Sequence, residues 1–136
     1  MSESIVHHIL IVEDHADSAL MLTRLLKRAG YLVQTAGRVE EALQLAKAAQ
    51  ADGTPFDLVL SDLGLPDATG YDLMRKLRQN HQLHGVALSG YGQADDVRRA
   101  KEAGFSHHLT KPIDFDRLKS VIQDLLSKSL TPGTCG

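Results

Sequence analysis

Five polar residues stand where short apolar runs of the sequence end. Glu13 and Asp14 follow the run HILIV, and Asp62 follows DLVLS, with a Gly, a Pro and a second Asp soon after it. Ser89 closes the run VALS, and Lys111 stands before a proline after SHHLT. Carboxylates that lie close together repel one another, and this repulsion is usually relieved when one of them has a raised pKa and is protonated or when a cation binds between them. An acidic all-oxygen site with room for water suits Mg²⁺ better than zinc.

Ser89 and Lys111 extend the expected chemistry from metal binding to phosphoryl transfer. A carboxylate can attack phosphorus to give an aspartyl phosphate, but two anions must approach, so a metal ion and an ammonium group have to neutralise charge. Lys111 supplies the ammonium group. The Ser89 hydroxyl can donate to a phosphoryl oxygen, and Gly90 lets the backbone come close because it has no Cβ.

Short apolar runs alternate along the chain with stretches whose apolar residues recur at helical spacing. This pattern predicts strands and helices that would position the polar residues. Five strand–helix units with right-handed crossovers predict a mostly parallel sheet with helices on both faces. Sites in such α/β folds lie beyond the carboxyl ends of strands, so Asp14 and Asp62 would face each other across about 4.8 Å if their strands are neighbours. The strands are expected over residues 8–12, 32–36, 57–61, 86–89 and 106–110, and the helices over 18–30, 39–50, 71–80, 95–104 and 115–126.

Apolar residues recur at helical spacing in the first and last predicted helices. Gly30 and Gly104 stand where two helices should stop. Residues 128–136 have no periodic apolar pattern and are expected to be a C-terminal tail or the start of a linker. The first stripe comprises Leu22, Leu25, Leu26 and Ala29, and the last comprises Leu118, Val121, Ile122 and Leu125.

The composition indicates one globular domain. A chain of 136 residues with 43% hydrophobic and 24% charged residues is long enough to bury a core and too short for two typical domains.

No apolar run approaches the roughly 20 residues of a membrane span, and no secretory signal is visible at the N-terminus. The net charge of -2 argues against direct nucleic-acid binding, and the lone Cys135 fits a reducing compartment. A cytoplasmic location is therefore expected.

Taken together, the order and spacing of the polar residues resemble the receiver domain of two-component response regulators over residues 7–127. The resemblance rests on the pair Glu13-Asp14, on Asp62 in DLGLPDATG, on Ser89 in LSGYG and on Lys111 in LTKP. It implies a flavodoxin-like doubly wound sheet of five parallel strands in the order 2-1-3-4-5, with five helices. The runs SGYGQ and AGFSHHLTKP also resemble receivers attached to hybrid sensor histidine kinases.

The resemblance also implies a role for each residue. Asp62 would be the phosphoacceptor, and Ser89 and Lys111 would hold the phosphoryl group. A cis Lys111-Pro112 peptide bond would form the tight turn that aims Lys111 at the phosphate. The implied Mg²⁺ ligands are Asp14, Asp62, the backbone carbonyl of Gly64 and, through water, Glu13.

Two residues depart from the commoner receiver pattern. Gly64 occupies a loop position that often carries a side chain over the phosphate, so water would enter more easily. His108 stands where the family usually has a Tyr or Phe that moves on activation. A histidine can also take up a proton near its reference pKa of about 6.5, so a switch through His108 would be sensitive to pH. An alternative is that His108 only fills the strand surface.

The expected function is that of a switch and not of an enzyme. The domain would accept a phosphoryl group from a sensor histidine kinase or a histidine phosphotransfer domain, as a monomer or weak dimer. One rival is a Mg²⁺-dependent phosphohydrolase, but such enzymes usually carry a second acid two residues after the nucleophile, where this chain has Gly64. The other rival is a degenerate receiver that acts only as an interaction module, which is disfavoured because all five chemical positions hold competent residue types.

Each of the candidate residues also has an ordinary structural interpretation. Asp14 before an amphipathic helix could be only an N-cap. Ser89 could form a turn at a strand end, and Lys111 could be a solvated loop lysine. The constellation of all five residues favours the functional interpretation over these separate ones.

Other motifs carry less weight. The run GYG lacks the third glycine of a dinucleotide loop because residue 95 is Asp, and GVALSGY has Tyr91 where a Walker motif needs lysine. The pairs His7-His8 and His107-His108 lie on extended chain, so the two side chains of each pair point to opposite faces and cannot chelate a metal together. Most of the seven histidines are therefore expected to be surface or filler residues.

Overall fold

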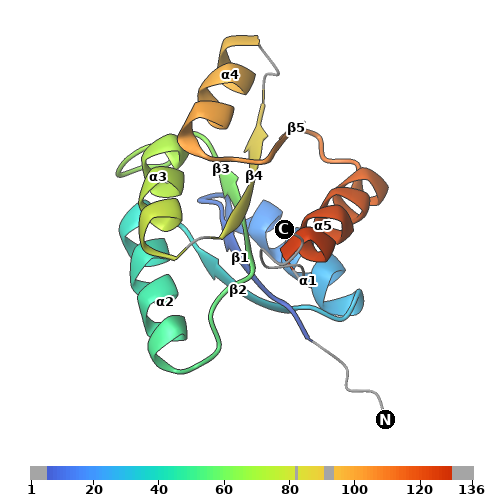
Figure 1. The fold of residues 1–136 in the computed structure, drawn as a ribbon. Helices are drawn as coiled ribbons and strands as arrows, with labels where there is room; N and C mark the ends of the chain where they lie inside the picture. The colour runs from blue at the N-terminus through green and yellow to red at the C-terminus, as the bar shows by residue number, and fades with distance from the viewer. Residues whose placement is uncertain (1–5, 82, 91–93, 130–136) are drawn as a thin grey trace.

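The computed structural model describes residues 6–81, 83–90 and 94–129 as one sheet with five helices (Figure 1). The strands are β1 (His8–Val12), β2 (Leu32–Ala36), β3 (Leu58–Asp62), β4 (His84–Ser89) and β5 (His107–Thr110). The helices are α1 (Ala16–Arg28), α2 (Val39–Ala51), α3 (Gly70–Asn80), α4 (Ala94–Ala103) and α5 (Phe115–Ser129). None of the helices described is both long and apolar enough to cross a bilayer.

All five strands run parallel in the order β2-β1-β3-β4-β5, which confirms the predicted doubly wound topology. Helices α1 and α5 lie on one side of the sheet, and α2, α3 and α4 lie on the other (Figure 1). The central strands β1 and β3 are buried along their whole length, as continuous apolar runs in a sheet covered on both faces require. At the edge, β2 is mostly exposed.

Two apolar clusters, one on each face, hold the layers together. The predicted stripe of α5 is buried in full. The predicted stripe of α1 is wrong in part, because Leu25 is only half-buried and Ala29 is exposed. Helix α1 begins earlier than expected and ends at Arg28, so Ala29 lies beyond the helix and Ala19 joins Leu22 and Leu26 in the core instead.

Glycines end two of the helices as predicted. Gly30 and Gly104 have φ angles of 102° and 115°, the left-handed conformation that favours glycine. At the C-terminus, α5 continues through Ser129, two residues into the predicted tail. The remainder of that tail, including Cys135, lies outside the described residues, as do residues 91–93, which include Tyr91 and Gly92 of the GYG motif.

Close packing around Gly85 on β4 gives a test of the core. A Cβ at Gly85 would overlap the sulfur of Met74 and lie 2.9 Å from a ring carbon of Phe105. A Cβ at Gly64, in contrast, would meet no heavy atom within 4 Å.

We therefore expect Gly85→Ala to lower the free energy of unfolding by about 1–3 kcal/mol, as overpacked cores do. Gly64→Ala, the matched control, should change it by less than about 0.5 kcal/mol. Urea denaturation followed by circular dichroism measures both. An equal effect of the two substitutions would show that the β4–α3 packing is looser than described.

Candidate functional site

The carboxyl edge of the sheet brings the predicted polar residues together. Strands β1 and β3 are neighbours, as the prediction required, and Val12 pairs with Ser61. Glu13 and Asp62 therefore follow at the same level on adjacent strands. Ser89 ends the next strand along, where it pairs with Thr110, and Lys111 comes directly after β5.

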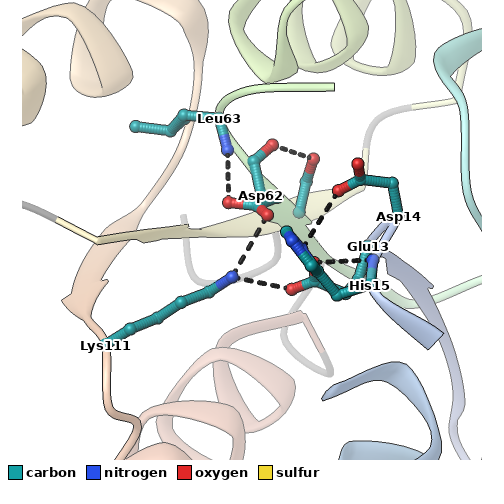
Figure 2. A network of polar contacts seen from close by, with 7 residues as sticks. Glu13, Asp14, His15, Asp62, Leu63 and Lys111 are labelled. Atoms are coloured by element: carbon teal, nitrogen blue, oxygen red, sulfur yellow. Dashed lines mark hydrogen bonds and ion pairs between the residues drawn. The ribbon is translucent and has the colours of Figure 1, made fainter. Parts of the chain in front are cut away.

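Lys111 lies between two carboxylates and donates hydrogen bonds to both (Figure 2). Its Nζ is 2.8 Å from Oε1 of Glu13 and 3.1 Å from Oδ2 of Asp62. The Glu13 side chain is fully buried, and 12% of the Asp62 side chain is exposed. A buried carboxylate without a partner is strongly disfavoured, so the single ammonium group is what allows both acids to occupy this edge.

Burial and like charge perturb the pKa values of these groups. Burial, together with the neighbouring Glu13 carboxylate, raises the pKa of Asp62, although Lys111 opposes the shift. Burial alone would raise the pKa of Glu13, but hydrogen bonds from Lys111 and His15 outweigh it and hold that pKa below its usual value. Burial alone would lower the pKa of Lys111, and its bonds to the two carboxylates raise it instead. Lys111 is therefore charged, and Asp62 is the acid more easily protonated.

The backbone around Asp62 fixes the orientation of its carboxylate. The amide of Leu63 donates to Oδ1 of Asp62 at 3.1 Å and to the carbonyl of Leu88 at 3.2 Å. Hydrogen bonds to both Asp62 oxygens leave the side chain little rotational freedom.

The loop after Asp62 is folded back on itself. Gly64 and Thr69 form an antiparallel bridge, and the Thr69 side chain accepts a hydrogen bond from the amide of Asp72 and so caps α3. Gly70 is confined, because a Cβ there would overlap the carbonyl oxygen of Asp62. Gly64 is exposed, and a Cβ there would meet no heavy atom within 4 Å, so no side chain stands at this position of the loop.

A second acid of this loop, Asp67, reaches across to α2. Its two carboxylate oxygens accept hydrogen bonds from the amides of Val39 and Glu40 at 2.8 and 3.0 Å. The N-cap residue of α2, Arg38, makes no side-chain cap. Asp67 therefore supplies the cap from 28 residues away, and these two bonds lower its pKa.

Ser89 and the turn after β5 lie as the resemblance implied. Ser89 is buried, and its carbonyl accepts a 2.7 Å hydrogen bond from the amide of Lys111. The Lys111-Pro112 peptide bond is cis, as predicted. The hydrogen bond from the Lys111 amide to the Ser89 carbonyl holds the start of the lysine side chain beside the end of β4.

The N-cap interpretation of Asp14 is not what the structure shows. Helix α1 begins at Ala16, and its N-cap is His15, which makes no side-chain cap. Asp14 instead lies in the loop between β1 and α1, at the rim of the acidic group (Figure 2).

A metal ion fits the donor set at this rim. One ligand atom from each of Glu13, Asp14, His15 and Asp62 lies within 4.8 Å of the others. The three carboxylates offer the oxygen ligands that Mg²⁺ prefers. These residues include the three acids predicted for Mg²⁺, and the fourth member, His15, was not predicted.

His15 is the residue of this site that the sequence analysis missed. Its ring Nδ1 is 3.0 Å from Oε2 of Glu13 and 3.4 Å from Oδ1 of Asp14. The hydrogen bond to Glu13 and the negative charge of Asp14 raise the pKa of His15. The signal for it was the tripeptide EDH, in which a histidine directly follows the acidic pair.

Three other histidines, at the start of β1 and of β5, have separate partners. His8 packs on Phe56 and contacts the carbonyl of Thr54, while His7, just before β1, lies 3.5 Å from Asp57. His107 points toward Asp124 of α5 at 3.8 Å. Within the part of the chain that the structure describes, neither predicted non-chelating pair belongs to a metal-binding group.

His108 lies on β5 with a buried ring nitrogen. Its Nε2 has no hydrogen-bond partner among the described residues. The ring borders a cavity of about 50 Å³ beside Val97 and Lys101 of α4, and another of about 290 Å³ beside Pro112 and Arg117. His108 therefore has space on two sides.

Comparisons with known proteins agree with this geometry. Residues 9–123 match the model of the response regulator receiver domain. The chain is 36% identical over 118 residues to the response regulator protein PilR of Pseudomonas aeruginosa, covering 86% of this chain and 25% of that protein. It is 32% identical over 122 residues to the two-component response regulator ARR11 of Arabidopsis thaliana, covering 90% of this chain and 23% of that protein. The chain thus spans about a quarter of the length of these curated relatives.

A solved structure shares the fold. The CheY-like response regulator receiver domain of Methylobacillus flagellatus superposes with a TM-score of 0.75 at 30% identity, over 89% of this chain and 99% of that one.

The cap formed by Asp67 gives a pH-dependent prediction. The pKa of Asp67 is lower in the folded state than its usual value of about 3.9, so the ionised cap stabilises the fold above that value and is lost as the pH falls through the lowered pKa. We expect Asp67→Asn to be less stable than the wild type at neutral pH, and the difference to shrink below about pH 4. Urea denaturation at neutral and acidic pH measures this difference. A difference that stays constant with pH would contradict the charged cap.

Proposed function

The chain belongs to the response regulator receiver domain family, and on that premise we propose that it is a phosphoacceptor switch. Asp62 accepts a phosphoryl group from a phosphohistidine in a Mg²⁺-dependent reaction, and the domain then changes its surface. The observation that supports this most directly is the position of Lys111, which donates hydrogen bonds to both Asp62 and Glu13.

In the proposed site Mg²⁺ is held by Asp14, Asp62 and the backbone carbonyl of Gly64, with Glu13 acting through water. The ion, when bound, neutralises charge on the phosphoryl oxygens and on the acids. The oxygen donors gathered within 4.8 Å at this rim fit that requirement.

The residues of the chain itself do the remaining work. A carboxylate oxygen of Asp62 forms a bond to phosphorus as the bond from phosphorus to the donor imidazole nitrogen breaks, and that nitrogen keeps the electron pair. The product is an aspartyl phosphate on Asp62 and a histidine on the donor. The restrained carboxylate meets the phosphorus without a further ordering cost.

Lys111 and Ser89 stabilise the transferred group in this proposal. Before transfer, the Lys111 ammonium is shared between two carboxylates, so it can turn to a phosphoryl oxygen while it keeps its contact with Glu13. The Ser89 hydroxyl, at the end of the adjacent strand, donates to a second phosphoryl oxygen. Both are donors aimed at charge that develops during the transfer.

The domain is proposed to be a switch and not a phosphohydrolase enzyme. A hydrolase of this kind would need an acid near the leaving group, and Gly64 at that position has no side chain. The donor partner is proposed to be a sensor histidine kinase or a histidine phosphotransfer domain, with which this family works. The setting is proposed to be the cytoplasm.

Incubation with acetyl phosphate and Mg²⁺ should add one phosphoryl group to the wild type and none to Asp62→Asn. Lys111→Ala should slow the reaction by about 100-fold, the usual cost of removing one donor to a developing anion. Lys76→Ala, an exposed lysine on α3, is the matched control and should react at the wild-type rate. Intact-mass spectrometry follows each reaction, with a chelator control. Equal labelling of Asp62→Asn would overturn the assignment of the phosphoacceptor.

His108 is proposed to be the element that carries the change to the surface. Its ring borders cavities toward α4 and toward α5, so two positions are open to it. A phosphoryl group on Asp62 would draw Ser89 inward and leave space near the end of β4. This space would change which of the two positions the His108 ring prefers. A ligand shifts such an equilibrium only through its differential affinity for the two states.

Beryllofluoride, a mimic of the phosphoryl group, should shift the amide NMR signals of α4, β5 and α5 in the wild type. The same shifts should be smaller in His108→Ala, because the variant lacks the ring that moves. Equal shifts at equal amplitude in both proteins would show that His108 only fills the strand surface.

A further inference from the structure

The ring of His15 lies against the acidic rim and not in open solvent. Its Nδ1 is 3.0 Å from Oε2 of Glu13 and 3.4 Å from Oδ1 of Asp14. The backbone amide of His15 also donates to the same Glu13 oxygen at 3.2 Å. Two contacts with one buried carboxylate oxygen hold the residue in place, although 72% of its side chain is exposed.

The two oxygens of Glu13 serve opposite sides of the site. Oε1 accepts a hydrogen bond from the positively charged Lys111 ammonium, whereas Oε2 faces His15 (Figure 2). An ion at the rim would therefore find three donors that the ammonium does not occupy. These are Oδ1 of Asp14 and Nδ1 of His15, which would contact the ion directly, and Oε2 of Glu13, which would act through water as in the proposed function.

The position of Nδ1 brings a nitrogen donor into the acidic group. Nδ1 shares a hydrogen bond of 3.0 Å with Oε2 of Glu13 and lies 3.4 Å from Oδ1 of Asp14. A ring nitrogen of His15 also lies within 4.8 Å of one oxygen from each of Glu13, Asp14 and Asp62. A metal ion at the rim would take the place of the Nδ1 proton, because a histidine ligand must be deprotonated at the coordinating nitrogen, and Nε2 would keep its proton.

We propose that His15 is a nitrogen ligand of the rim site, and that with it the domain takes a first-row transition dication such as Mn²⁺ in preference to Mg²⁺. The proposal rests on the metal site of the proposed function and adds a donor to it. Imidazole is the preferred ligand of the first-row dications from iron to zinc, and Mn²⁺, the member of this row that prefers oxygen most, still binds imidazole more readily than Mg²⁺, which keeps to oxygen and water. One histidine would thus change which ion occupies the site, while the carboxylates would still accept Mg²⁺.

Metal titrations of the purified protein test this selectivity. Free Mn²⁺ is followed by its EPR signal, and Mg²⁺ affinity is measured by competition against bound Mn²⁺, at about pH 8 so that an ordinary histidine is neutral. His15→Ala is compared with the wild type. The matched control is His81→Ala, a histidine that follows α3 at the opposite edge of the sheet.

We expect His15→Ala to weaken Mn²⁺ binding by about 10- to 100-fold, at least the cost of losing an outer-shell partner, and to leave Mg²⁺ binding within about twofold. His81→Ala should match the wild type for both ions. A loss of affinity that is equal for Mn²⁺ and Mg²⁺ would overturn the proposal, because His15 would then only position Glu13.

Pulsed EPR of the Mn²⁺ complex supplies a direct signature. A bound imidazole gives a nitrogen coupling that should be present in the wild type and absent in His15→Ala. Mg²⁺ binding with no nitrogen coupling would overturn the role of His15 and leave the proposed function standing. Failure of both ions to bind either protein would overturn the metal site itself and the proposed function with it.

Discussion

The burial of Glu13 and Asp62 side by side is the constraint on which the carboxyl edge of this domain depends. Two acids placed on adjacent parallel strands repel each other and lose hydration, and one ammonium group, that of Lys111, compensates both. The hydrogen bond from the Lys111 amide to the Ser89 carbonyl brings the lysine chain to this point. The same arrangement restrains the Asp62 carboxylate at the tip of β3. Lys111 therefore serves both the electrostatic requirement of the fold and the proposed chemistry.

Much of this edge could be predicted from the sequence, because parallel strands end together. Once the apolar runs are identified as strands, the residues that follow them must share one edge, and the spacing of Glu13, Asp14, Asp62, Ser89 and Lys111 becomes meaningful. The strand order and the cis Lys111-Pro112 bond followed from the family resemblance, and the structure confirms both.

Three features could not be predicted from the sequence because they depend on the three-dimensional arrangement of the chain. The capping of α2 by Asp67 joins residues 28 positions apart, and no local sequence pattern indicates it. The contact of His15 with Glu13 depends on the angle at which the chain leaves β1. The stripe of α1 was misplaced at Ala29 because a helix end is set by its cap and not by apolar spacing alone.

A crystal structure of the domain with beryllofluoride and Mg²⁺ would test the central claim most directly, namely that Lys111 and the paired acids form a phosphoacceptor site. We expect beryllium bonded to a carboxylate oxygen of Asp62, with the Lys111 ammonium on one fluoride and the Ser89 hydroxyl on another. Beryllofluoride bonded to a different residue, or a Lys111 ammonium that still binds Glu13 and Asp62 and makes no contact with fluoride, would contradict this assignment.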